Sequence, residues 1–141
     1  EMLPSSEIDF GHMPKGNWPI VTYAAKWESG SVEDVGTQPV CPAPLEPALA
    51  QLVEEAARTA WQVIGRETGY GRVDLRVAPD GQPFVLEVNP NPDISENAGL
   101  SRMAAARGWD YDTLILTVVE EALSRAKRRQ SAESQDLKIS A

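Results

Sequence analysis

Three oxygen-bearing side chains lie at alternate positions in two short segments of this sequence. Asp74 lies within residues 72–77, and Glu87 and Asn89 lie within residues 84–89. Polar and apolar residues alternate in both segments, which is typical of β-strands with one buried face. Carboxylate and amide oxygens are the ligands that Mg²⁺ and Mn²⁺ prefer, so the set could hold a divalent cation. Waters or phosphate oxygens would then complete the coordination shell.

The segment between the two strands predicts a tight hairpin. It reads Pro79-Asp80-Gly81-Gln82, and Asp-Gly is the strongest short signal for a two-residue type I′ turn. Such a turn pairs Asp74 with Glu87, Arg72 with Asn89, and Val77 with Phe84. One face of the hairpin is then apolar and is expected to pack in the core. That face comprises Val73, Leu75, Val77, Phe84, Leu86 and Val88.

Two facing carboxylates repel each other unless positive charge lies between them. Arg72 and Arg76 flank Asp74 on the same face of the strand and could neutralise the pair. A divalent cation is the second possibility, and spacing alone favours the two about equally. The turn Pro90-Asn91-Pro92 follows Asn89 directly and fixes that side chain at a strand end, which favours the metal.

The segments around the hairpin predict three helices. Apolar residues recur at helical spacing over 47–65, where Pro47 suits the first turn and Gly65 the end. A short alanine-rich helix is expected over 98–106, and a longer one begins near Tyr111 with Asp110 as its cap.

The predicted fold class is α+β, an antiparallel sheet that includes the hairpin and carries packed helices. Residues 7–10 and 18–23 are expected to form further strands, and 28–44 to form a long loop. We assign residues 1–129 to one subdomain and residues 130–141 to a polar tail that is weakly held.

Composition excludes several classes of function. The 141-residue chain has a net charge of −8, which argues against unaided binding to nucleic acid or an anionic membrane. One cysteine and one histidine exclude an internal disulfide and a Cys/His zinc site. No apolar run approaches the roughly 18–20 residues of a membrane span, and the first residues do not resemble a signal peptide. We therefore expect a cytoplasmic protein.

The segment GYGRVDLRVAPDGQPFVLEVNPNPDIS resembles the final catalytic hairpin of ATP-grasp ligases, and most closely the D-alanine–D-alanine ligase branch. The upstream segments TYAAKW and CPAPL resemble the family's loop with a phosphate-contacting lysine, and the predicted helices follow in the family's order. The resemblance therefore covers most of the chain and implies the C-terminal subdomain of an ATP-grasp fold.

The resemblance also implies roles for five residues. Asp74, Glu87 and Asn89 would hold two Mg²⁺ or Mn²⁺ ions on the phosphates of ATP, with Glu87 bridging the ions. Arg72 would face the oxyanion that forms when an amine attacks an acyl phosphate, and Lys26 would bind a phosphate. The implied reaction joins a small-molecule carboxylate to an amine at the expense of ATP.

The chain departs from the D-alanine–D-alanine ligase pattern at two positions of the loop that grips the second substrate. Asp93 stands where the branch has glycine, and Ala98 where it has serine. A different carboxylate–amine pair is therefore expected. The chain resembles only a C-terminal half, and its adenine-holding half is expected in the same polypeptide or in a partner. The alternative is a non-catalytic standalone module that keeps this half-fold and a metal site.

Overall fold

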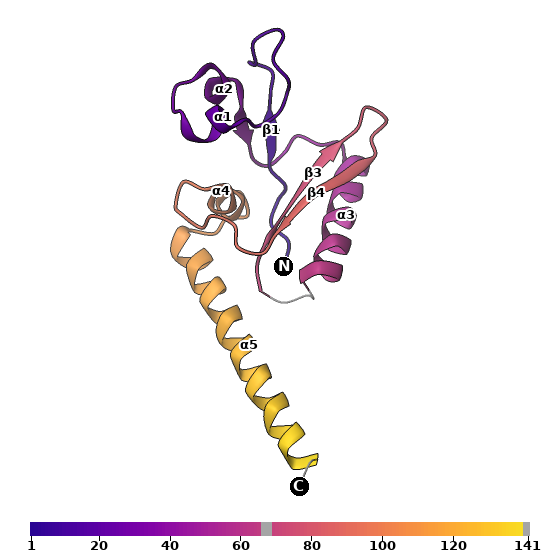
Figure 1. Cartoon of the computed structure of the whole chain (residues 1–141), viewed down its shortest axis with the longest axis vertical. Helices are drawn as coiled ribbons and strands as arrows, with labels where there is room; N and C mark the ends of the chain where they lie inside the picture. Colours follow the sequence, from indigo (N-terminus) through magenta and orange to yellow (C-terminus); the bar gives the residue numbers. More distant parts are fainter. Residues whose placement is uncertain (66–68, 140–141) are drawn as a thin grey trace. The chain divides into compact units, whose positions relative to one another are not determined.

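The computed structural model describes residues 1–65 and 69–139. Contacts between residues divide the chain into two compact units, Glu1–Pro44 and Leu45–Ala141. Each unit combines a two-stranded antiparallel sheet with helices, and Figure 1 shows the elements in chain order. The predicted α+β class is therefore confirmed, with two small sheets in place of the single sheet that was expected.

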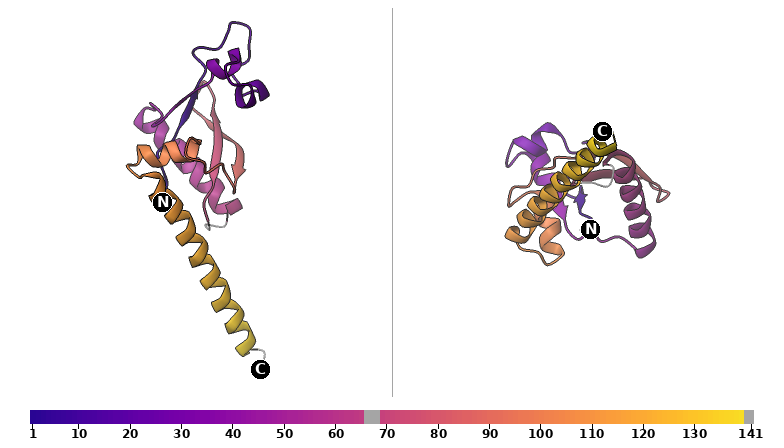
Figure 2. Two further views of the ribbon diagram at one scale, coloured as in Figure 1. Left: turned by 90° about the vertical axis from the view of Figure 1, so that its left-hand side faces the viewer. Right: turned by 90° about the horizontal axis from the view of Figure 1, so that it is seen from below.

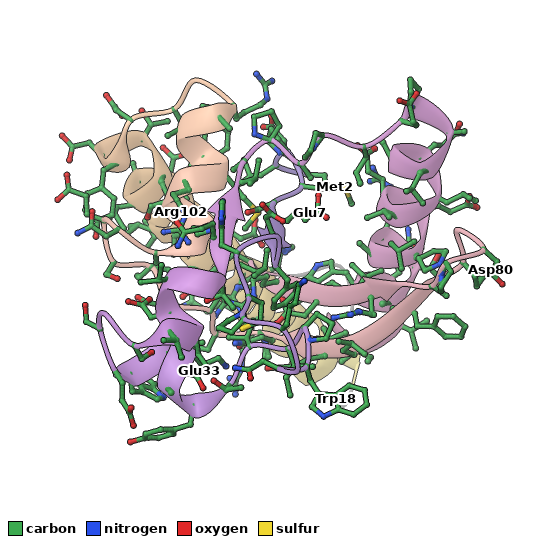
Figure 3. The ribbon with its side chains drawn as sticks, turned by 90° about the horizontal axis from the view of Figure 1, so that it is seen from above. Met2, Glu7, Trp18, Glu33, Asp80 and Arg102 are labelled. Carbon is green, nitrogen blue, oxygen red and sulfur yellow. The ribbon has the colours of Figure 1, made fainter. Side chains whose placement is uncertain are left out.

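The first unit is built around strands β1 (Glu7–Asp9) and β2 (Gln38–Val40), which pair antiparallel. Helices α1 (Tyr23–Trp27) and α2 (Val32–Gly36) lie between them in the chain. The large apolar side chains of these helices are more than half exposed. Trp18, which precedes α1, is 79% exposed, and Figure 3 shows its side chain pointing away from the ribbon.

The sequence predictions for residues 18–44 are corrected in two places. The strand expected over 18–23 does not form, and the loop expected over 28–44 contains α2 and β2. Local capping decides both cases. The Thr22 side chain accepts a hydrogen bond from the Ala25 backbone N at 3.2 Å and starts α1. The Ser31 hydroxyl accepts one from the Asp34 backbone N at 3.0 Å and starts α2.

The second unit contains the hairpin and the three predicted helices. Helix α3 contacts both strands of the hairpin and α4 contacts α5, as Figures 1 and 2 show. The elements are α3 (Pro47–Gly65), β3 (Arg72–Val77), β4 (Pro83–Asn89), α4 (Gly99–Ala106) and α5 (Tyr111–Ile139).

The ends of the helices agree with the signals in the sequence. The Asp110 carboxylate accepts a hydrogen bond from the Thr113 backbone N at 2.8 Å and caps α5, as predicted. Gly108, at φ +91°, follows the end of α4. Helix α5 continues beyond residue 129 to Ile139, so its helical backbone extends into the segment predicted to be a polar tail.

The Trp61 side chain packs between α3 and the hairpin. Its ring lies over Gly65 and Gly71, where an added Cβ on either glycine would overlap the ring. A Cβ on Gly71 would also lie 2.9 Å from the carbonyl oxygen of Asn89. Only glycine therefore fits immediately before β3, at the end of the hairpin that carries Arg72 and Asn89.

Few of the side chains that the structure describes in the second unit, within residues 45–65 and 69–130, are buried. The Ser101 hydroxyl is buried among them and donates to the Ser95 carbonyl at 2.8 Å. Phe84 and Leu86 on β4, and Leu116 and Leu123 on α5, are more than half exposed. The buried apolar residues include Val53, Ala98, Leu100, Ala104 and Leu114. Among the described helices, we find none with the length and apolar character that crossing a membrane demands.

Candidate functional site

The part of the hairpin next to its open end has the predicted register. Arg72 faces Asn89, and Asp74 faces Glu87. Residues directly opposite each other on antiparallel strands share a face of the sheet. The two carboxylates, the asparagine and the arginine therefore occupy one face of β3 and β4, and this group of four is called the polar hairpin site below.

The turn of the hairpin differs from the prediction. The Ala78 backbone N donates to the Gln82 carbonyl at 2.9 Å, so Pro79, Asp80 and Gly81 form a three-residue turn. The Gly81 N donates to the Ala78 carbonyl at 2.9 Å, and Gly81 has φ +86°. A two-residue turn requires a backbone N–H from the position that Pro79 occupies, and proline has none. Figure 3 shows Asp80 at the tip of the turn.

A bulge corrects for the longer turn. The register shifts by one residue between Asp74 and Leu75, so that Leu75 faces Val85 while Asp74 still faces Glu87. The predicted pairing of Val77 with Phe84 is wrong, because Val77 faces Pro83. Bulges of this kind re-aim the side chains around them.

The bulge changes which apolar side chain joins the polar face. Phe84 faces Arg76 and therefore shares the face that carries Asp74, and 56% of its surface is exposed. Leu86, the residue left without a partner at the shift, is 68% exposed. The predicted core positions of Phe84 and Leu86 are therefore wrong. The missing N–H of Pro79 was the sequence signal for this shift.

Arg72 neutralises Asp74 directly. Its Nε donates to Oδ1 at 2.6 Å and its Nη2 to Oδ2 at 2.9 Å, and both side chains are 35% exposed. The hydrogen bond to Asp74 raises the pKa of Arg72, partial burial opposes this, and the negative charges of Asp74, Glu87 and Asp93 add to it. The first of the two possibilities for the carboxylate pair, neutralisation by arginine, is thus realised at Asp74.

The residues after β4 hold the end of the strand in place. Asn89 Oδ1 accepts a hydrogen bond from the Asn91 backbone N at 2.9 Å. Asp93 Oδ1 accepts from the backbone N of Ser95 at 2.8 Å and from its hydroxyl at 2.7 Å. These hydrogen bonds from Ser95, followed by the charge of Arg72, lower the pKa of Asp93, so this carboxylate is ionised at neutral pH.

The approach to β3 is fixed by helix α5. The Gly69 backbone N donates to Glu121 Oε1 at 3.2 Å, and Arg128 Nη2 donates to the same oxygen at 3.0 Å. The hydrogen bond from Gly69 is the main reason why the pKa of Glu121 is lowered, with Arg128 and Arg125 contributing. This contact helps to position the start of the strand that carries Arg72.

The polar hairpin site fits a divalent cation in the chemistry of its donors. Asp74, Glu87 and Asn89 offer oxygen atoms from one face of the hairpin. Among the residues whose side chains the structure describes, 1–65 and 69–130, we find no group of three or more His, Cys, Asp or Glu side chains placed to hold a metal. Two carboxylates and an amide therefore need further oxygens from water or a phosphate ligand to complete six-fold coordination.

The fifth predicted site residue lies elsewhere in the chain. Lys26 belongs to the last turn of α1 in the first unit, and its side chain is exposed. Arg72, Asp74, Glu87 and Asn89 lie together in the second unit. The hairpin thus unites four of the five residues.

A family model described as "D-ala D-ala ligase C-terminus" matches residues 12–120, which span both units of the chain. The match includes Lys26 and all four members of the polar hairpin site.

Individual relatives agree with the family match. A D-alanine–D-alanine ligase of Desulfotalea psychrophila is 32% identical over 92% of this chain and 37% of its own length. One of Synechococcus sp. strain JA-3-3Ab is 38% identical over 79% of this chain and 33% of its own. An uncharacterized protein, y4sG, of Sinorhizobium fredii is 32% identical over 89% of this chain and 35% of its own. The chain thus spans about a third of the length of these relatives.

Proposed function

Since the chain belongs to the D-ala D-ala ligase C-terminal family, we propose that it is the C-terminal part of an ATP-dependent carboxylate–amine ligase. The observation that carries this proposal is the pairing of Asp74 with Glu87 beside Arg72 on one face of the hairpin. Such a site suits phosphoryl transfer, in which catalysis consists mainly of positioning and electrostatic stabilisation.

Asp74, Glu87 and Asn89 would hold two Mg²⁺ or Mn²⁺ ions on the phosphates of ATP. When bound, the ions would neutralise negative charge on the transferred phosphoryl group. The bulge keeps Asp74 opposite Glu87, and the Asn91 backbone N–H fixes the orientation of the Asn89 amide. The protein would thereby present its three ligands on a rigid strand pair, as a precise site requires.

Arg72 would stabilise the oxyanion that forms when the amine attacks the acyl phosphate. The carboxylate substrate first takes the γ-phosphoryl group of ATP and releases ADP; the amine then displaces phosphate and loses a proton. A guanidinium aimed at the new oxyanion favours the transition state over the ground state. The Arg72 pKa, raised by Asp74, keeps the side chain charged at any working pH.

Lys26 would bind a phosphate oxygen of ATP. Its side chain is exposed at the end of α1, and Trp27 beside it has 71% of its surface exposed. A lysine ammonium recognises phosphate as a compact point charge.

The substrates would be a small carboxylic acid and an amine that differ from the D-alanine pair. Asp93 is exposed and ionised close enough to Arg72 for their charges to interact. A carboxylate at this position repels a substrate carboxylate and attracts a cation.

The adenine-holding half would lie in the same polypeptide or in a partner, and the complete enzyme would be cytoplasmic. Many large apolar side chains are exposed, which supports a further protein surface that would cover them, because exposed apolar side chains that cluster mark an interaction site. They include Leu116, Val119 and Leu123 at helical spacing on α5.

A second candidate is a non-catalytic module that keeps the half-fold and its metal ligands. The ion pair between Arg72 and Asp74 favours it, because the hairpin neutralises part of its own charge without a metal. Turnover separates the two candidates. The assay measures ADP formation by the longest natural chain with panels of carboxylates and amines. The ligase is supported if ADP forms and if Glu87→Gln lowers the rate of its formation about 100-fold or more. Absence of ADP formation with every pair supports the module.

A further inference from the structure

An ion pair of the hairpin joins Asp74, a predicted metal ligand, to Arg72, the predicted oxyanion-stabilising residue. Arg72 engages both oxygens of Asp74, through Nε at 2.6 Å and Nη2 at 2.9 Å. Bidentate arginine–carboxylate pairs are short, directional and among the stronger hydrogen-bonded contacts in proteins. Both carboxylate oxygens of Asp74 thus accept hydrogen bonds from the Arg72 guanidinium.

The Arg72 guanidinium is also attracted by the charges of two other carboxylates. Glu87, opposite Asp74, and Asp93, in the loop after β4, both interact with its charge. The guanidinium thus lies on the face where a divalent cation would bind. A divalent cation on Asp74 would lie next to the positive charge of the Arg72 guanidinium, and the two like charges would repel each other. The arginine and the metal cannot both make their best contacts with this carboxylate.

We infer that Arg72 and the divalent cation are alternative partners of Asp74. Without metal, Arg72 holds Asp74 and reduces the repulsion between Asp74 and Glu87. When the cation binds Asp74, the guanidinium is released from both carboxylate oxygens. Its Nε–H and Nη2–H donors are then available to a substrate oxyanion. This last step rests on the proposed function, whereas the competition itself does not.

The competition predicts a reciprocal coupling between the ion pair and metal affinity. Any interaction that favours Arg72 on Asp74 must weaken metal binding by the same factor. Removing the guanidinium should therefore tighten metal binding, although the arginine belongs to the site. A residue whose only role is to support the local structure would have the opposite effect, because its loss would disorder the ligands.

The test measures Mn²⁺ affinity by electron paramagnetic resonance of the free ion, using the longest natural chain. Arg72→Gln should bind Mn²⁺ about tenfold more tightly than the wild type, within the usual range of coupling. Arg76→Gln is the matched control, because it makes the same charge change two residues along the same face. It should tighten binding less, because the hydrogen bonds to both Asp74 carboxylate oxygens come from Arg72. Equal effects of the two substitutions, or weaker binding by Arg72→Gln, would overturn the proposal.

Two further measurements keep the result interpretable. Adding Asp74→Asn should abolish the gain from Arg72→Gln, since the shared carboxylate is then lost. If Arg72→Gln does not fold, the ¹⁵N resonance of the wild-type Arg72 Nε–H reports the same event. It should move toward the value of a solvent-exposed arginine as Mg²⁺ saturates the site, and an unchanged resonance at saturation would contradict release.

The outcome is separate from that of the proposed function. Tighter Mn²⁺ binding by Arg72→Gln in a chain that forms no ADP would uphold the competition and contradict the ligase. If the wild-type chain forms ADP but Arg72→Gln does not tighten Mn²⁺ binding, the ligase is supported and the competition is contradicted. Failure of every variant to bind Mn²⁺ would overturn the competition.

Discussion

Asp74 faces Glu87 across the hairpin although the turn between the strands is one residue longer than the sequence suggests. The bulge between Asp74 and Leu75 compensates for the extra turn residue. The pairing of Asp74 with Glu87 is thus kept, while the residue pairs nearer the turn shift by one residue. A local irregularity beside a candidate site is typical of strands that must aim particular side chains.

The corrected register predicts which cysteine pairs form a cross-strand disulfide. In a Cys41→Ser background, Val77→Cys with Pro83→Cys should bridge readily under mild oxidation, because residues 77 and 83 face each other. Val77→Cys with Phe84→Cys should bridge poorly, because their side chains point to opposite faces. Thiol titration and peptide mapping measure both. Efficient bridging of 77 to 84 alone would restore the two-residue turn.

The contact of the Trp61 ring with Gly71 predicts a strict requirement for glycine at position 71. Gly71→Ala should lower the free energy of unfolding by about 1–3 kcal/mol, because the added methyl group overlaps the Trp61 ring. Gly99→Ala in α4 is the control, since the nearest atom to its new Cβ is the end of the Arg102 side chain at 3.8 Å. Urea denaturation compares the two. Equal stability of both variants would show that the ring is not held against this strand.

The Glu121 contact predicts a pH dependence of stability. Its folded-state pKa is lowered, so its contribution is fully present above the ordinary pKa of about 4.3 and is lost as pH falls through the folded value. Glu121→Gln should flatten the acid limb of a plot of melting temperature against pH. Glu120→Gln, an exposed neighbour on α5, should leave that limb unchanged. Identical acid limbs for wild type and Glu121→Gln would contradict the contact.

The sequence was most informative where many residues repeat one pattern. The apolar spacing over 47–65 and the cap at Asp110 correctly predicted α3 and the start of α5. The pairing of Asp74 with Glu87 was also predicted, although the turn type assumed for it was wrong. Elements of five residues escaped prediction, because a single capping hydrogen bond rather than periodicity fixes them. The S-x-x-D pattern at Ser31 was the available signal for α2.

The ion pair between Arg72 and Asp74 is the feature of the site that the sequence could not predict. Alternation places both residues on one face, but it does not decide whether an arginine or a metal neutralises the carboxylate. That choice depends on side-chain conformations, which the spacing leaves open. The structure has the Arg72 Nε 2.6 Å from the Asp74 Oδ1. The catalytic role of Arg72, the phosphate-binding role of Lys26 and the metal-binding roles of Asp74, Glu87 and Asn89 all stay predictions.

The most direct test of the central claim is the affinity of the longest natural chain for Mn²⁺·ATP, with Glu87→Gln compared against wild type by calorimetry. Glu87→Gln should weaken binding about tenfold or more, since a charged ligand is lost, while the melting temperature stays nearly constant. Glu54→Gln, on the exposed face of α3, should change neither quantity. Unchanged Mn²⁺·ATP binding together with a large loss of stability in Glu87→Gln would make Glu87 a structural residue and would contradict the metal–nucleotide site.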